Sequence, residues 1–356
     1  MDYVIFLLVV IFIILELIIK NNIKKNNLFK LMMLLFTVIG CLRSYKVGTD
    51  TYFYFYDYTL IPEMSFTDLS SLRYEFGFSL LCKLLGTIFA DPQFLLVFTS
   101  VFMNFVTYKF IKNNTKNHLL AGIFFFTLNY YFEFLCLMRQ GIALSFILIS
   151  YEKLKNNKNI QFLLFLIIAT LFHTSAIIML LMYPIKKIKR SNLVLPTAIF
   201  GSLLTFILIR PIFNFLAINI NDYSKYILSE YNAASYVSGG LYSLTSLLFL
   251  MFGLIVPNRK NIKEKLDENE YSLLAWIITI GTIISVASIK IAIFHRLYMY
   301  FGFFIIIWLE KNIEVLSDKN KTIWKLVIYT LTFCYVLVIT NLGWYDVIPY
   351  TFFWEV

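Results

Sequence analysis

The chain has 356 residues, of which 60% are hydrophobic, 19% aromatic and only 15% charged, and its formal net charge is +10. The mean hydropathy of +0.75 excludes a soluble globular protein and indicates an integral membrane protein. The positive charge lies mainly in Lys-rich connections between apolar segments, so it reports membrane orientation and not nucleic-acid binding. We therefore expect no nucleic acid as a partner.

The first apolar segment, residues 3–19, lacks a basic start and a small-residue cleavage site. It is therefore predicted to be a retained membrane span and not a signal peptide. The four cysteines are scattered along the chain, and no CxxC pair occurs. This pattern supports neither a structural metal site nor a disulfide framework.

Twelve apolar segments are predicted to cross the membrane as helices. A span needs roughly 20 apolar residues, although shorter ones occur, and backbone polar groups in lipid must be bonded within the helix. We therefore expect one all-α polytopic domain over residues 1–356. The predicted spans are 3–19, 28–42, 93–111, 119–136, 139–154, 160–172, 174–185, 193–209, 241–257, 272–289, 296–310 and 323–341.

The lysines determine the predicted orientation. With both termini outside, 20 of the 24 Lys lie in or beside cytoplasmic connections, as the positive-inside rule requires. The outer side then has two long loops, at about 43–92 and 210–240, and an outer tail at 342–356. Long loops on a rigid scaffold are where function concentrates.

Two segments need a different interpretation. Segment 76–90 is apolar but short and contains Lys83, and a crossing there would reverse every later orientation. We predict an outer interfacial or re-entrant helix for it. Segment 160–185 is too long for one straight helix and has Lys on both sides. It is predicted to form a hairpin with His173 near the outer turn.

Arginine is distributed differently from lysine. Five of the seven Arg lie at outer span ends or in outer loops, namely Arg43, Arg73, Arg139, Arg210 and Arg296. A guanidinium is a planar fork of permanently charged donors, which suits pyrophosphate and carboxylate groups better than an ammonium does. The outer face is therefore predicted to bind an anion.

The first outer loop combines charged and Tyr-rich sequence. After Arg43, residues Gly48-Thr49-Asp50 predict a turn that presents a carboxylate. The run that begins at Tyr52 can stack on sugar faces, although Tyr is also enriched at membrane interfaces without any binding role. Glu75 then opens the predicted interfacial helix.

Three later motifs carry further polar candidates. Arg139 begins a predicted span. Its side chain is a candidate for binding the anion, and the alternative is that it extends to lipid headgroups. His173 lies within an apolar segment, and polar groups at such depth usually mark a site, although packing against a neighbouring helix is the alternative. His295 and Arg296 begin the eleventh predicted span and are followed by Tyr298.

These motifs, in this order, resemble a known family. Arg…Gly-Thr-Asp…Tyr, Glu-Phe-Gly-Phe, Met-Arg-Gln-Gly-Ile-Ala, Phe-His-Thr-Ser-Ala and Arg-Leu-Tyr-Met-Tyr-Phe, spread over residues 43–301, are similar to the EpsG group of Wzy-type polysaccharide polymerases. The resemblance implies a GT-C-like glycosyltransferase in the bacterial inner membrane. Its substrate would be an oligosaccharide on undecaprenyl pyrophosphate, polymerised at the outer face into capsule, exopolysaccharide or O-antigen. Membrane lipid, a flippase and a chain-length regulator would be its partners.

The implied substrate suggests a role for each candidate residue. No DxD triad occurs, which disfavours a metal-dependent nucleotide-sugar enzyme, so neither a metal nor another cofactor is expected. Positive charge would stabilise the pyrophosphate leaving group, and Asp50, Glu75 or His173 would take the acceptor proton. His173 suits this best, because an ordinary His titrates near neutral pH. The predicted substrate-binding residues are Arg43, Arg139, Arg296, His295, Tyr52 and Tyr298.

Other classes of membrane protein remain open at this point. They are another lipid-phosphate-dependent transferase or O-antigen-type ligase, a transporter of lipid-linked oligosaccharides, and an acyltransferase. Transporters usually place charges at mid-membrane across repeated halves, and no such halves are detectable here. In an acyltransferase the arginines would have no evident role.

Overall fold

The computed structural model describes residues 2–189, 192–219, 236–343 and 345–355. These residues form helices and turns, and the β structure found among them is one isolated bridge between Arg43 and Phe352. The expected all-α class is therefore confirmed. The chain divides into two compact units: unit 1 comprises Met1–Ile177 and Thr322–Val356, and unit 2 comprises Ile178–Lys321.

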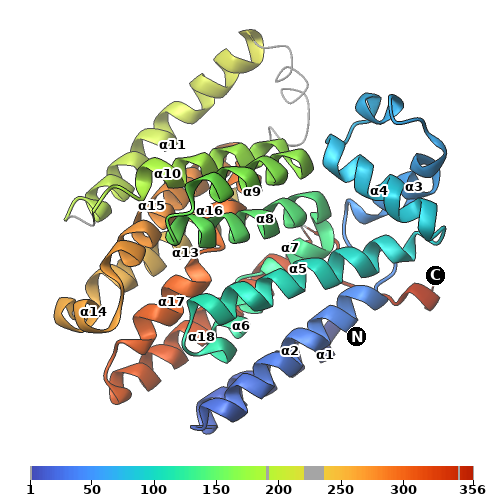
Figure 1. The fold of residues 1–356 in the computed structure, drawn as a ribbon. Coiled ribbons are helices and arrows are strands. Elements are labelled where there is room, and N and C mark those ends of the chain that lie inside the picture. The colour runs from blue at the N-terminus through green and yellow to red at the C-terminus, as the bar shows by residue number, and fades with distance from the viewer. Residues whose placement is uncertain (1, 190–191, 220–235, 344, 356) are drawn as a thin grey trace. The chain divides into compact units, whose positions relative to one another are not determined.

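Unit 1 begins with two long helices, of which α2 packs along α5 (Figure 1, blue to green). The boundary with unit 2 falls within the 3₁₀ segment η3 (Thr174–Leu181). The helices of unit 1 are α1 (Asp2–Ile18), α2 (Asn22–Leu42), α3 (Thr51–Leu60), α4 (Phe76–Ile88), α5 (Gln93–Asn114), α6 (His118–Thr127), α7 (Tyr130–Cys136), α8 (Met138–Lys155), α9 (Asn159–Phe172) and nearly all of α18 (Asp318–Asn341), together with three short 3₁₀ turns, η1 (Ile61–Glu63), η2 (Asp68–Ser71) and η5 (Phe353–Glu355).

Unit 2 is also helical, and its central helix α15 packs against α11, α13 and α16. A Ser–Thr contact inside the unit joins α13 to α15, where Ser246 and Thr282 hydroxyl oxygens are 2.8 Å apart. The helices are α10 (Met182–Ile185), α11 (Val194–Asn219), α13 (Tyr236–Ile255), α14 (Arg259–Lys265), α15 (Glu268–Lys290), α16 (Phe294–Gly302) and α17 (Ile305–Glu314).

Six of the described helices are long and apolar enough to cross a membrane: α2, α5, α11, α13, α15 and α18. The pair α6 and α7 makes a seventh candidate if its two bent halves form one span. Shorter apolar helices cover residues 3–18, 76–88, 159–172 and 174–185. The protein is therefore a multi-pass membrane protein, whereas the full set of twelve spans stays a prediction.

The fourth predicted span, 119–136, is broken into α6 and α7, which are bent by 56°. The break lies at Asn129, whose φ of 74° is in the left-handed region. Asn enters this region more readily than other residues with a side chain. Sequence hydropathy treats the segment as continuous because the residues around the break, apart from Glu133, are apolar or uncharged.

Two predicted connections also differ from the structure. Residues 210–219 continue α11 and residues 236–240 begin α13, so the connection predicted at 210–240 is shorter, and its middle part, 220–235, lies outside the described residues. Pro211 lies inside α11, as proline does in membrane helices whose surroundings satisfy the freed carbonyl. The predicted interfacial segment 76–90 is helical over Phe76–Ile88.

The C-terminal tail folds back onto the start of the first predicted outer loop. Ser44 N donates to Thr351 O at 2.9 Å, and Gly48 N donates to Asp346 O at 2.9 Å. Gly48 has a φ of +98°, and a Cβ there would lie 3.0 Å from the backbone of Cys136. The predicted turn at residues 48–50 is therefore present, and the tail holds it in place.

Candidate active site

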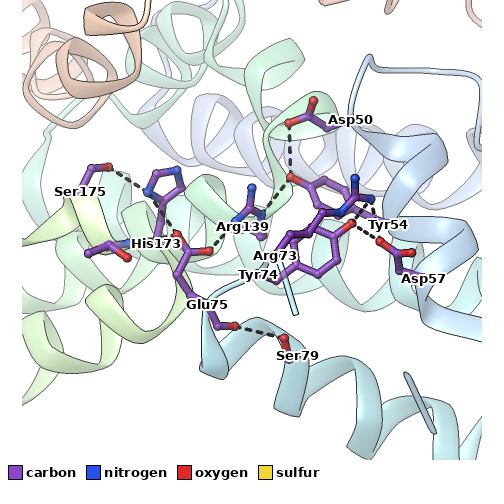
Figure 2. Close-up of polar contacts among 11 residues, drawn as sticks. Asp50, Tyr54, Asp57, Arg73, Tyr74, Glu75, Ser79, Arg139, His173 and Ser175 are labelled. Carbon is purple, nitrogen blue, oxygen red and sulfur yellow. Dashed lines mark hydrogen bonds and ion pairs between the residues drawn. The ribbon is translucent and has the colours of Figure 1, made fainter. Parts of the chain in front are cut away.

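A polar cluster in unit 1 joins α3, the segment before α4, the start of α8 and the end of α9 (Figure 2). Arg139 is its central cation. Its Nη1 forms an ion pair with Glu75, and its Nε donates to the Tyr54 hydroxyl at 3.2 Å. The side chains of Arg139 and Glu75 are only 16% and 18% exposed. Electrostatic interactions are stronger here than they would be in bulk water.

Glu75 connects Arg139 to the end of α9. Its Oε1 accepts a hydrogen bond from Thr174 N at 3.2 Å and lies 3.9 Å from His173 Nδ1. Burial raises the pKa of Glu75, but the positive charge of Arg139 and the proximity of His173 outweigh it, so the pKa is below its ordinary value. Glu75 is therefore an anion that holds two partners at once.

His173 lies at the turn between the two apolar halves, as the sequence predicts. Helix α9 ends at Phe172, and His173 is its C-terminal cap with extended backbone. The ring is mostly buried, and Nδ1 is 2.8 Å from the Ser175 hydroxyl. A helix end is a place where a polar side chain can leave the helix and still find partners, because the last carbonyls lack helical donors.

The close approach of α4 to α9 brings Glu75 to His173. At Gly77 the two helices are so near that an added Cβ would lie 2.6 Å from the carbonyl oxygen of Leu171. A backbone oxygen cannot rotate away as a flexible side chain can. Glycine in the Glu-Phe-Gly-Phe motif is therefore required by this contact.

We expect Gly77→Ala to lower the activity of this site by about tenfold, because a displaced α4 moves Glu75 relative to His173. Helix propensity acts in the opposite direction, since Ala favours a helix over Gly by about 1 kcal/mol. Gly240→Ala is the control, because Gly240 is also helical but has no atom within 4 Å of the added Cβ. Activity per molecule of protein in the membrane measures the effect. Equal activity of the two variants would show that the α4–α9 contact does not position the site.

Asp50 is linked to Arg139 through Tyr54. Asp50 precedes α3, and the Tyr54 hydroxyl, one turn into that helix, donates to Asp50 Oδ2 at 3.3 Å. The same hydroxyl accepts from Arg139. Three predicted site residues (Asp50, Glu75 and His173) thus join the Arg139 cluster directly or through one side chain.

Sequence reasoning did not single out Tyr54 or Tyr74. The Tyr74 ring has guanidinium carbons at 4.8 Å (Arg73) and 4.9 Å (Arg139) from its centre. Its hydroxyl donates to Asp57, which also pairs with Arg73 at 2.7 Å. Two features of the sequence could have pointed to them. Asp50 and Tyr54 are four residues apart, which places both on one helix face, and Tyr74 stands between two charged residues.

Two other predicted residues of unit 1, Arg43 and Tyr52, have different surroundings from those of the Arg139 cluster. Arg43 is fully buried, and its Nη1 donates to Gly40 O at 2.6 Å and to Ser100 Oγ at 2.8 Å. Its Nε and Nη2 have no hydrogen-bond partner among the described residues. Tyr52 is 54% exposed, and its ring lies 5.9 Å from that of Tyr45.

The remaining predicted residues belong to unit 2. His295 is 4% exposed and its ring stacks on Tyr242 with a centroid distance of 4.0 Å. Tyr298 is also buried, with its ring 5.7 Å from Tyr242. Arg296 lies in the first turn of α16, two residues after its start at Phe294. The predicted role of these three residues in substrate binding stays a prediction.

The apolar helices make this a multi-pass membrane protein. The largely buried Arg–carboxylate–His cluster forms a polar site close to the start of α8. Residues 26–352 match the EpsG family, and the chain belongs to this family, whose members are Wzy-like polysaccharide polymerases. No curated protein and no solved structure matches the chain.

Proposed function

We propose that this protein is a membrane glycosyltransferase that joins oligosaccharide repeat units carried on undecaprenyl pyrophosphate at the outer face of the bacterial inner membrane. The single observation that supports it most is the series of contacts from Arg139 through Glu75 to His173 in a protein that belongs to the EpsG family. These residues supply both a cation for a leaving group and a base for an acceptor.

In the proposed reaction, an acceptor hydroxyl attacks the anomeric carbon of the donor saccharide. The bond from that carbon to the pyrophosphate oxygen breaks, and the pyrophosphate leaves with the electron pair. A guanidinium has five N–H donors, and the contacts to Glu75 and Tyr54 use two of them. We assign the remaining donors of Arg139 to the pyrophosphate oxygens, where they would stabilise the growing negative charge.

His173 is the proposed general base. Glu75 is a poorer candidate because its lowered pKa makes it a weak proton acceptor. Its two contacts suit a positioning role, in which it holds Arg139 and the turn at residues 173–174. Asp50 is the alternative base, since it reaches the cluster through Tyr54.

The other predicted residues keep supporting roles in this proposal. Arg296 would add positive charge for the pyrophosphate, His295 would contact the substrate, and Arg43 would assist or orient the incoming chain. Tyr52 and Tyr298 would contact sugars. A GT-C-like bundle of about twelve spans, no metal or other cofactor, and contacts with a flippase and a chain-length regulator complete the proposal.

Deleting the gene and sizing the polysaccharide tests the function. Loss of a polymerase leaves single repeat units on the lipid carrier at the outer face, whereas loss of a transporter leaves them inside. Complementation with the wild-type gene should restore long polymer. Unchanged polymer length after deletion would contradict the proposal.

Membrane orientation gives an independent prediction. In a background without Cys41, Cys82, Cys136 and Cys334, a cysteine at Trp354 should react with an impermeant thiol reagent in intact cells. A cysteine at Asn156 should react only after the cells are opened. Both positions are exposed, so accessibility alone does not separate them. Labelling of Asn156 in intact cells would reverse the orientation and exclude an outer active site.

The same labelling approach extends to two further positions. Thr49 should react from outside because it precedes Asp50 in the first predicted outer loop. Asn261, in the Lys-rich connection between α13 and α15, should be protected in intact cells. Ser235, also predicted to lie outside, is beyond the described residues.

A further inference from the structure

The Lys-rich end of unit 1 contains a pocket of about 240 Å³ that the proposed reaction does not use. The pocket lies between the starts of α2 and α6 and includes no carboxylate among the described lining residues. Its lining consists of Asn22, Ile23, Lys25, Asn26, Lys116, Asn117 and His118. Cations and amide donors of this kind favour an anion.

Two helices begin at this pocket. Helix α2 has 21 residues and starts at Asn22, and α6 has 10 residues and starts at His118. The capping residues Asn21 and Asn117 accept bonds from backbone N–H groups further into each helix. The positive ends of both helix dipoles add to the charge of the side chains.

A buried carboxylate fixes the two walls of the pocket. The Glu16 side chain has no exposed surface, and it accepts hydrogen bonds from Lys25 Nζ at 2.6 Å and from Asn117 Nδ2 at 2.8 Å. Lys325 Nζ at 2.6 Å and the Tyr329 hydroxyl at 3.0 Å complete its partners. Two ammonium groups, Lys25 and Lys325, face this one carboxylate. Lys116 adds a further positive charge in the lining of the pocket, so the local charge is positive.

The pocket is far from the proposed active site along α2. A helix of 21 residues is about 31 Å long at 1.5 Å per residue, and Arg43 is at its other end. This length equals the hydrocarbon thickness of a bilayer. When α2 crosses the membrane, the pocket lies at headgroup height on the side opposite the Asp50 turn.

We propose that this pocket binds a phosphate group in addition to, and separately from, the lipid-pyrophosphate substrate. The group belongs either to the headgroup of an anionic membrane lipid or to a small soluble phosphate compound. Lys116 and His118 make the direct contacts, while Glu16 holds Lys25 and Asn117 in the positions that close the site.

Two probes distinguish the sources. The purified full-length protein is placed in bilayer discs of zwitterionic lipid and titrated with inorganic phosphate, with thermal unfolding as the readout. In parallel, retention of phosphatidylglycerol by the detergent-extracted protein is measured by native mass spectrometry. Stabilisation by phosphate identifies a soluble ligand, and specific retention of the lipid identifies a headgroup.

Lys116→Gln and His118→Gln test the residues, with Lys24→Gln as the matched control, because Lys24 is a neighbouring cation that does not line the pocket. We expect each pocket variant to weaken binding by about tenfold, the loss of one charge-assisted contact, and the control to leave it unchanged. Polymer formation should persist in all three, which shows that they are folded. Binding of neither probe, or an equal loss in Lys24→Gln, would overturn the proposal.

Discussion

Arg139→Lys is expected to reduce polymer formation by about 10²-fold or more, the cost of removing one preorganised donor to a developing oxyanion. The substitution preserves the charge but removes the planar fork. One ammonium cannot replace both the ion pair with Glu75 and the bond from Nε to Tyr54, nor the face that Arg139 presents to Tyr74. Polymer length and the protein's abundance in the membrane should be measured together.

Arg73→Lys is the matched control for this variant. Arg73 contacts the same Tyr74 ring, but its side chain is 53% exposed and it pairs with Asp57. Lysine can keep that ion pair, so activity should remain close to normal. If Arg139→Lys and Arg296→Lys both made normal polymer, the two arginines would be interfacial anchors and the proposed pyrophosphate site would be excluded.

His173→Gln is expected to lower turnover by roughly 10²–10⁴-fold, the usual contribution of a general base. Gln keeps a polar group beside Ser175 and Glu75 but cannot accept a proton near neutral pH. Lipid-linked substrate should still bind, because the pyrophosphate contacts are assigned to Arg139. The measurement is turnover by the purified variant on a synthetic lipid-linked repeat unit.

Two further variants separate catalysis from packing at this turn. Ser175→Ala removes the hydroxyl 2.8 Å from Nδ1 and should lower activity only mildly. If His173→Gln lost abundance but kept full activity per molecule, His173 would be a packing residue. If Asp50→Asn lost activity while His173→Gln kept it, the base would be the carboxylate beside Tyr54.

Hydropathy and charge predicted the helical class and several helix boundaries well. The turn at His173 was predictable because lysines flank a segment too long for one straight helix. The break at Asn129 was not, because an uncharged residue inside an apolar run leaves hydropathy unchanged even when its backbone is left-handed. Hydropathy carries no information about such a backbone conformation, and the preference of Asn for it is too weak to place a break.

The candidate site was predictable as a set of residue types, but less so as a set of contacts. Glu75 and His173 are 98 positions apart in sequence, and the α4–α9 approach at Gly77 that joins them depends on the tertiary fold. For Arg43, charge and position predicted a substrate contact, which stays a prediction. Its contacts to Gly40 and Ser100 depend on the tertiary fold and could not be read from the sequence.

The tail that covers the Gly48 turn has a consequence for how the protein is made. Ser44 and Thr351 are 307 positions apart, so the Asp50 segment leaves the ribosome long before its backbone partners exist. The turn that supports Asp50 and Tyr54 can be completed only after residues 346–351 have been made, since synthesis proceeds from the N-terminus. A chain that ends before residue 346 would carry every residue of the Arg139 cluster and still lack the tail that holds the Gly48 turn. Formation of this side of the site is thus coupled to synthesis of the segment at residues 346–351.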